Sequence, residues 1–138
     1  MKRCNVLLFF GLAVPLLIAA TAEAKEFKLL NDSSVPAATG KVDVGKDRNG
    51  NYRVRVEVRH LAKPSALNPP KQAYVVWVQS RRDPQAVPLG ELRVNDDLQG
   101  SLEATTPYEE FELFITAEDN PNTRFPSEPH LLRATVSP

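Results

Sequence analysis

The chain has 138 residues, with 17 basic and 17 acidic side chains and a formal net charge of zero. This length predicts one domain large enough to bury a core, and the balanced charge argues against nucleic acid as a partner. Because Cys4 is the only cysteine, an internal disulfide and a zinc site built from cysteines are both excluded.

The first 24 residues have the pattern of a cleaved secretory signal peptide. A positively charged start precedes an apolar run over residues 6–20, and small residues at positions 22 and 24 follow it. The run contains Pro15 and is shorter than the roughly 20 residues that a helix needs to cross a bilayer. We therefore expect residues 1–24 to be removed and residues 25–138 to form a single secreted or periplasmic domain without a stable membrane anchor.

The clearest strand in the sequence covers residues 52–59. Apolar and aromatic residues occupy every even position there and charged residues every odd one, so a strand would collect the apolar side chains on one face. The dipeptide Asn49-Gly50 precedes it and favours a tight turn, and a shorter alternating segment lies at residues 41–44. These segments predict a β-hairpin.

The rest of the chain predicts further short strands, with prolines in the loops between them because proline cannot donate to a β-ladder. The predicted strands are residues 73–79, 87–94, 98–104, 111–117 and 131–136, with a further short strand at residues 27–30. About seven or eight short strands bounded by turns favour an all-β fold. The specific expectation is an antiparallel β-sandwich of immunoglobulin-like arrangement.

Several of these segments together resemble a known family of domains. The run Tyr74-Val75-Val76-Trp77-Val78, the Leu89-Gly90 step after it, Gly100 and the strand beginning at Phe111 resemble the extracytoplasmic C-terminal domain of anti-sigma-K-type regulators. The resemblance implies a sensory, non-catalytic domain. Those regulators carry a sigma-binding segment and a transmembrane helix ahead of this domain. We expect neither in this chain.

The predicted strand at residues 73–79 is unusual because apolar side chains occupy both of its faces. Val75 and Trp77 share one face, and Phe114 points the same way if its strand is a neighbour. Together they would form an apolar patch on the outside of the sheet, and exposed aromatic patches often mark interaction sites. In the alternative interpretation, residues 63–71 or residues 27–30 fold across this face and cover it.

Three arginines, Arg53, Arg55 and Arg59, lie on the polar face of the strand at residues 52–59. A row of guanidinium groups can bind a carboxylate, a phosphate or a sulfated glycan through bidentate hydrogen bonds. Alternatively, the row is a solvated face whose charges form cross-strand ion pairs.

Residues suited to catalysis or metal binding show no recognisable pattern. The two histidines, His60 and His130, lie far apart in the sequence, and a zinc site needs several converging ligands. We therefore expect no enzymatic activity, no cofactor and no metal. The leading hypothesis is a non-catalytic exported module that contacts a protein partner in the cell envelope. The alternative is a soluble binder of a small anionic ligand or glycan through the arginine-lined face.

Overall fold

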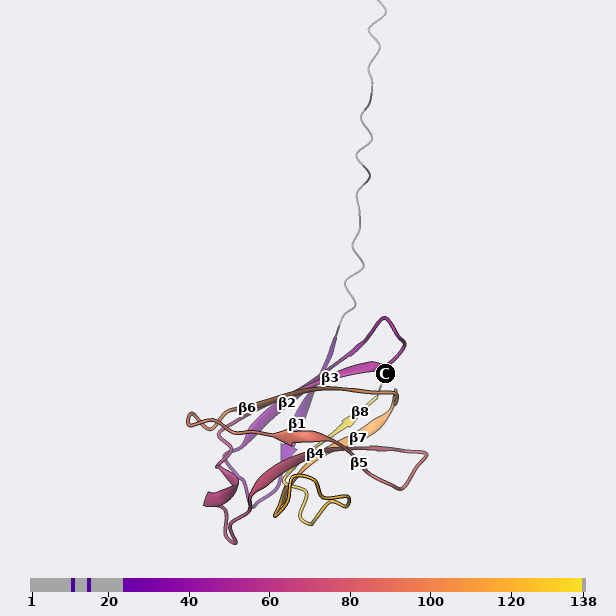
Figure 1. Ribbon diagram of the computed structural model, residues 1–138. Helices are drawn as coiled ribbons and strands as arrows, with labels where there is room; N and C mark the ends of the chain where they lie inside the picture. Colours follow the sequence, from indigo (N-terminus) through magenta and orange to yellow (C-terminus); the bar gives the residue numbers. More distant parts are fainter. Residues whose placement is uncertain (1–10, 12–14, 16–23, 138) are drawn as a thin grey trace, which may run out of the picture.

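Eight strands and one short 3-10 turn make up the fold (Figure 1). The computed structural model describes Gly11, Pro15 and residues 24–137, so nearly all of the predicted signal segment lies outside the described residues. Among the residues described, no helix has the length and apolar character needed to span a membrane. The elements are β1 (Lys25–Asn31), β2 (Thr39–Lys46), β3 (Tyr52–Arg59), η1 (Pro64–Ala66), β4 (Ala73–Ser80), β5 (Val87–Leu92), β6 (Gly100–Thr106), β7 (Phe111–Glu118) and β8 (Leu132–Val136).

The strands form one antiparallel sheet in the order β5-β4-β7-β8-β1-β2-β3-β6. Strand β1 joins its two halves, because Lys25 to Leu29 pair with β2 whereas Leu30 and Asn31 pair with β8. The two ends of the order also meet, since β5 contacts β6 and an isolated bridge links Val94 to Gly100. The sheet is therefore barrel-like.

The expected strands are present, with shifts at their ends. The prediction of an all-β antiparallel fold is confirmed, and the short segment at residues 27–30 is part of a full strand, β1. The predicted strand at residues 98–104 begins later, at Gly100, because residues 95–99 form a turn in which the Asn95 N–H donates to the Gln99 carbonyl. The expected strand end at Val94 is likewise reduced to the isolated bridge.

The turn between β2 and β3 is wider than the Asn-Gly dipeptide predicts. Gly50 has a φ of 82°, but Asn49 keeps a negative φ. The Asp47 carboxylate builds the turn instead, because its Oδ1 accepts hydrogen bonds from the N–H groups of Asn49 and Asn51 at 2.8 and 2.9 Å. Because these two side-chain hydrogen bonds hold the turn, it does not need the two positive-φ residues of a two-residue hairpin.

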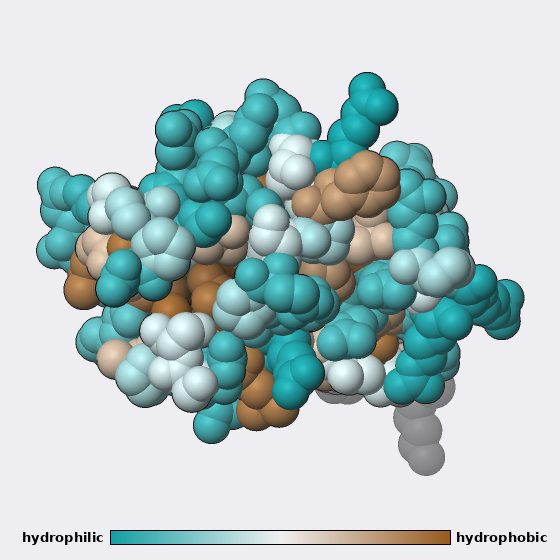
Figure 2. Space-filling model, turned by 90° about the horizontal axis from the view of Figure 1, so that it is seen from below, coloured by the Kyte–Doolittle hydropathy of each residue, from teal (hydrophilic) through white to brown (hydrophobic). Residues whose placement is uncertain are grey.

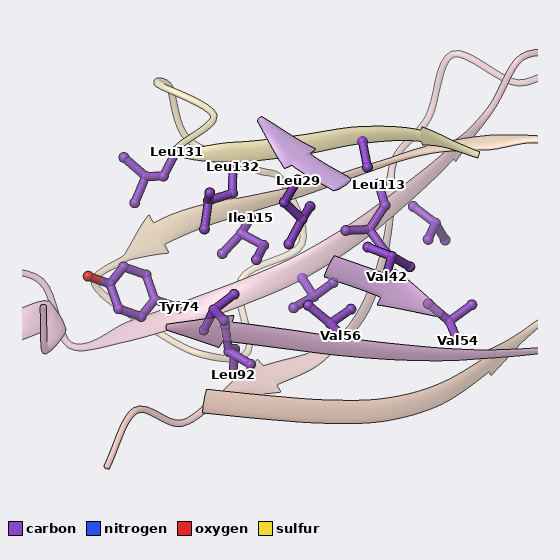
Figure 3. Close-up of a cluster of buried hydrophobic side chains, with 14 of the residues drawn as sticks. Leu29, Val42, Val54, Val56, Tyr74, Leu92, Leu113, Ile115, Leu131 and Leu132 are labelled. Carbon is purple, nitrogen blue, oxygen red and sulfur yellow. The ribbon is translucent and has the colours of Figure 1, made fainter. Parts of the chain in front are cut away.

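The main core lies between the two halves of the sheet, and Figure 3 shows side chains from both halves pointing toward one another. The alternation predicted for β3 is confirmed, since Val54, Val56 and Val58 are at most 1% exposed. Tyr74 is buried with them and donates its hydroxyl to the Ala62 carbonyl at 2.6 Å. Burial raises the pKa of Tyr74 to about 12, so the phenol remains a donor at neutral pH.

Gly100 allows β5 and β6 to approach each other. A Cβ atom there would lie 2.8 Å from the Arg93 carbonyl oxygen and 3.3 Å from a methyl group of Val58. The first distance is shorter than real contacts permit, and the atom it meets belongs to the backbone. A side chain at this position would therefore push the two strands apart.

We predict that Gly100→Ala lowers the free energy of unfolding by about 1–3 kcal/mol, the usual cost of forcing atoms into a packed site. Urea denaturation followed by circular dichroism measures the change. Gly45→Ala is the matched control, because its added Cβ would meet Ala24 at an ordinary 3.7 Å. Equal denaturation midpoints for the two variants would contradict the proposed steric role of Gly100.

Candidate functional site

The apolar residues predicted for the outer face of β4 and β7 do lie together. Trp77 pairs with Phe114 across the two strands, and Val75 lies two residues away on the same face. The Trp77 and Phe114 rings are stacked with centroids 6.5 Å apart. All three side chains are at most 1% exposed, however, so the expectation of an exposed patch is wrong.

The loop between β7 and β8 covers these residues. His130, at the end of that loop, stacks on Phe114 with ring centroids 3.9 Å apart, and Ala86 packs against the cluster from the β4–β5 connection. In Figure 1 this loop, coloured orange to yellow, lies below β4. Figure 2 views the molecule from that side and shows a mostly hydrophilic surface with only small apolar patches.

The two segments predicted as alternative covers lie elsewhere. Phe27 packs against the main core and Leu30 is 61% exposed. Of residues 63–71, in the β3–β4 connection, Leu67 packs against the main core, and none packs against the Trp77 cluster. The alternative prediction that another segment covers this face is correct, but the segments that it named are wrong. The composition of a loop does not indicate which face of a strand the loop will cross.

A buried carboxylate fastens the covering loop to β7. Glu118, which is 3% exposed, accepts hydrogen bonds from the Ser127 N–H at 2.7 Å and the Ser127 hydroxyl at 2.6 Å. It also accepts from the Thr116 hydroxyl at 2.7 Å, and Thr116 in turn accepts from the Trp77 indole N–H at 2.9 Å. This network ties the loop, the strand and the tryptophan together.

The outer face of β2, β3 and β6 carries a lattice of ion pairs. Arg53 contacts Glu103 at 3.4 Å and Arg55 contacts Glu57 at 3.1 Å. Lys41 reaches three carboxylates, and Asp43, the largest influence, raises its pKa together with Glu26 and Glu57. Arg53 therefore makes the cross-strand ion pair predicted for a solvated face, whereas Arg55 pairs with a residue of its own strand.

Arg55 and Arg59 also line an open hollow of about 350 Å³, referred to here as the arginine groove. Arg53 does not line it, whereas Arg93, from the segment after β5, does. Among the residues described, Arg59 has no carboxylate within ion-pair distance. Arg93 lies 3.7 Å from a Glu91 carboxylate oxygen, and its side chain is 86% exposed. The lining residues are Arg55, Glu57, Val58, Arg59, Arg93, Asn95, Gln99, Gly100 and Ser101.

Strand pairing and a tight turn assemble this groove. Gly100 pairs with Val58 in β3 and bridges to Val94, which brings Arg93 beside the end of β3. The Asn95 side-chain oxygen accepts from the N–H groups of Asp97 and Gln99, both at 3.0 Å, and so fixes the turn that follows. Arg93 was missed as a member of this site because it lies more than thirty residues from β3 in the sequence, and only the β3–β6 register and the Val94–Gly100 bridge bring the two together.

Two residues next to the groove have backbone conformations that non-glycine residues rarely adopt. His60 has a φ of 56° and Leu98 a φ of 59°. They follow Arg59 and precede Gln99 directly, and the Leu61 N–H donates to the Leu98 carbonyl at 3.2 Å. Strained residues of this kind cluster at functional sites, where the surrounding structure holds them in place.

The chemistry of the groove is that of anion recognition. Its lining contains three guanidinium groups and one carboxylate, Glu57. Guanidinium groups bind carboxylate, sulfate and phosphate oxygens through paired hydrogen bonds. No cluster of three or more metal-ligating side chains occurs in the part of the chain that the structure describes.

Comparison with known proteins adds no assignment. No protein-family model matches the chain, and no curated protein matches it. The resemblance to anti-sigma-K-type regulators therefore stays a prediction from sequence motifs.

We predict that Glu118→Gln weakens the attachment of the covering loop. The amide oxygen can keep the bonds made to Oε1 and the NH₂ group can donate to the Ser127 hydroxyl, but the negative charge is lost. Hydrogen bonds to a charged group are stronger than neutral ones, so we expect a loss of about 1–2 kcal/mol. Trp77 is the only tryptophan, so its quenching by acrylamide reports on the cover, and urea denaturation reports on stability. Glu110→Gln, an exposed position in the β6–β7 turn, is the control. Unchanged quenching and stability in Glu118→Gln would contradict the anchoring role.

Proposed function

We propose that this protein is a non-catalytic exported module that binds an anionic ligand in the arginine groove. One observation carries the proposal: Arg55, Arg59 and Arg93, from two separate parts of the chain, line the same open hollow. The turn that places Arg93 beside the other two arginines contains a strained residue, Leu98. A surface that only has to be soluble would not require this strain, whereas a binding site can.

The lining of the groove favours binding over catalysis. Its single carboxylate, Glu57, already lies within 3.1 Å of the Arg55 guanidinium and 3.7 Å of the Lys41 ammonium. The remaining polar groups are amides and a serine hydroxyl, which orient a ligand through hydrogen bonds. Such a set of groups can hold carboxylate, sulfate or phosphate oxygens in place without a general base.

We also propose export to the periplasm or the medium, with cleavage after Ala24. The support is the signal pattern in the sequence together with the position of β1, which begins at Lys25 and pairs at once with Val44. The folded domain thus begins directly after the expected cleavage point.

For the fold, we propose a closed variant of the immunoglobulin-like β-sandwich. The support is strand pairing: β3 pairs with β6, and β7 lies between β4 and β8. These neighbours correspond to the B–E and C–F–G pairings of an immunoglobulin sandwich. Strand β1 would then be the addition that joins the two sheets.

A second candidate function is contact with a protein partner in the cell envelope, as the resemblance to anti-sigma-K-type regulators implies. The observation that favours it is the exposure of two apolar side chains at the β7–β8 loop. Phe125 in the loop is 70% exposed, and Leu30 is 61% exposed and lines a hollow with Glu128 and His130. The contact surface would be these residues rather than the covered Trp77 cluster.

For the arginine groove, we predict that Arg59→Gln weakens binding of a heparin tetrasaccharide about fivefold, the effect of losing one exposed ion pair. Titration calorimetry at low salt measures the affinity. Arg48→Gln, in the exposed turn at the other end of β3, removes the same charge and should bind as the wild type does. If the wild type does not bind, or if both variants lose affinity equally, the groove is not the binding site.

For the second candidate, we predict that Phe125→Ser abolishes capture of an envelope protein by crosslinking in the producing cell. Val87→Ser, at an exposed position at the start of β5, should keep the capture. Recovery of the module without any crosslinked partner, or unchanged capture by Phe125→Ser, would remove the support for this function.

A further inference from the structure

A second hollow adjoins the arginine groove and shares Arg93 with it. Its volume is about 520 Å³, and it lies between the β3–β4 connection and the segment after β5. Two lysines, Lys63 and Lys71, line it, and Ser65 and Gln72 supply a hydroxyl and an amide. Its one carboxylate, Glu91, lies 3.7 Å from the Arg93 guanidinium. Cationic groups therefore line both hollows, with the exposed Arg93 guanidinium belonging to each.

Backbone hydrogen bonds hold the two lysines in position. The Lys71 N–H donates to the Pro64 carbonyl at 2.9 Å, and the Ala66 N–H donates to the Lys63 carbonyl at 2.9 Å. The next residue, Gln72, donates its N–H to the Glu118 carbonyl at 3.0 Å. The wall of the second hollow is thus formed before any ligand arrives, which keeps the entropic cost of binding low.

Each lysine has an acidic partner that is more exposed than the lysine itself. Lys63 donates to Asp96, and the hydrogen bond holds the pKa of that carboxyl below its ordinary value. The exposed fractions are 46% for the lysine and 95% for the aspartate. Lys71 and Asp119 lie 3.5 Å apart, with exposed fractions of 27% and 78%. Exposed ion pairs contribute little stability, so a ligand anion can replace either aspartate at small cost.

We propose that the ligand of this surface is an extended anionic polysaccharide that crosses both hollows over Arg93. The proposal rests on the proposed function of the arginine groove. A single small anion would need only one of the hollows, whereas anionic groups repeated along a chain can meet the cations of both. The amides of Asn95, Gln99 and Gln72 suit the hydroxyl groups that separate those anions on a sugar chain.

The absence of aromatic side chains separates this ligand from a nucleic acid. Proteins that bind single strands stack bases on aromatic rings in addition to binding the phosphates. Neither hollow has a tryptophan, tyrosine, phenylalanine or histidine among the described residues that line it. The surface offers charge and hydrogen bonds but no stacking platform, which fits a sulfated or carboxylated glycan.

The test compares ligands of two lengths on the purified exported protein. Titration calorimetry should show at least tenfold tighter binding of a heparin dodecasaccharide than of a heparin tetrasaccharide. The comparison is corrected for the larger number of positions at which the longer chain can bind. Lys71→Gln should weaken the dodecasaccharide about fivefold and leave the tetrasaccharide unchanged. Lys46→Gln, an exposed position at the far end of β2, is the control and should affect neither.

The outcomes separate this proposal from the proposed function on which it rests. If Arg59→Gln weakens both oligosaccharides but length and Lys71 have no effect, the groove binds anions and the extended site is wrong. If neither oligosaccharide binds, both are wrong. A single-stranded oligothymidylate of the same charge as the dodecasaccharide is the last probe. Binding of that probe as tight as binding of the dodecasaccharide would overturn the choice of a polysaccharide.

Discussion

The strand pair β4–β7 is apolar on both faces, and the rest of the molecule is arranged to cover it. Tyr74, Val76 and Val78 point into the main core, where the other half of the sheet buries them. Val75, Trp77 and Phe114 point the opposite way and need a cover that no strand provides. The β7–β8 loop supplies that cover through His130, and Ala86 of the β4–β5 connection adds to it. Polar groups fasten the loop: the Glu118 carboxylate binds Ser127 and, through Thr116, the Trp77 indole.

The sequence predicts well which face of a strand each side chain points to, and poorly which distant segments pack against that face. Period-two alternation placed Val54, Val56 and Val58 inside and identified the two-faced character of the strand with Trp77, because a strand's pleat follows directly from residue order. The covering loop was not predictable in the same way. It is rich in proline and polar residues, like any exposed loop, and Glu118 resembles the charged end of an ordinary strand. Its burial depends on a fold-back that local pattern does not encode.

The arginine groove shows the same division. Arg55 and Arg59 are neighbours on one strand face, so their proximity could be read from spacing alone. Arg93 joins them only because β3 pairs with β6 in a particular register, and because Gly100 leaves room for the backbone at Arg93. Arg53 looked equivalent in sequence, yet it pairs with Glu103 and lies outside the groove. Register, rather than residue type, decides which arginines share a site.

The approach of β5 to β6 has a consequence for the behaviour of the protein at high concentration. In an open sheet these two strands would be the edges, each with a row of free backbone groups on which another chain can add a strand. Here the edges face each other, the Val94–Gly100 bridge joins them, and Pro88 removes one donor from β5. Closing the sheet on itself therefore leaves few free backbone groups on which a second copy of the protein can add a strand.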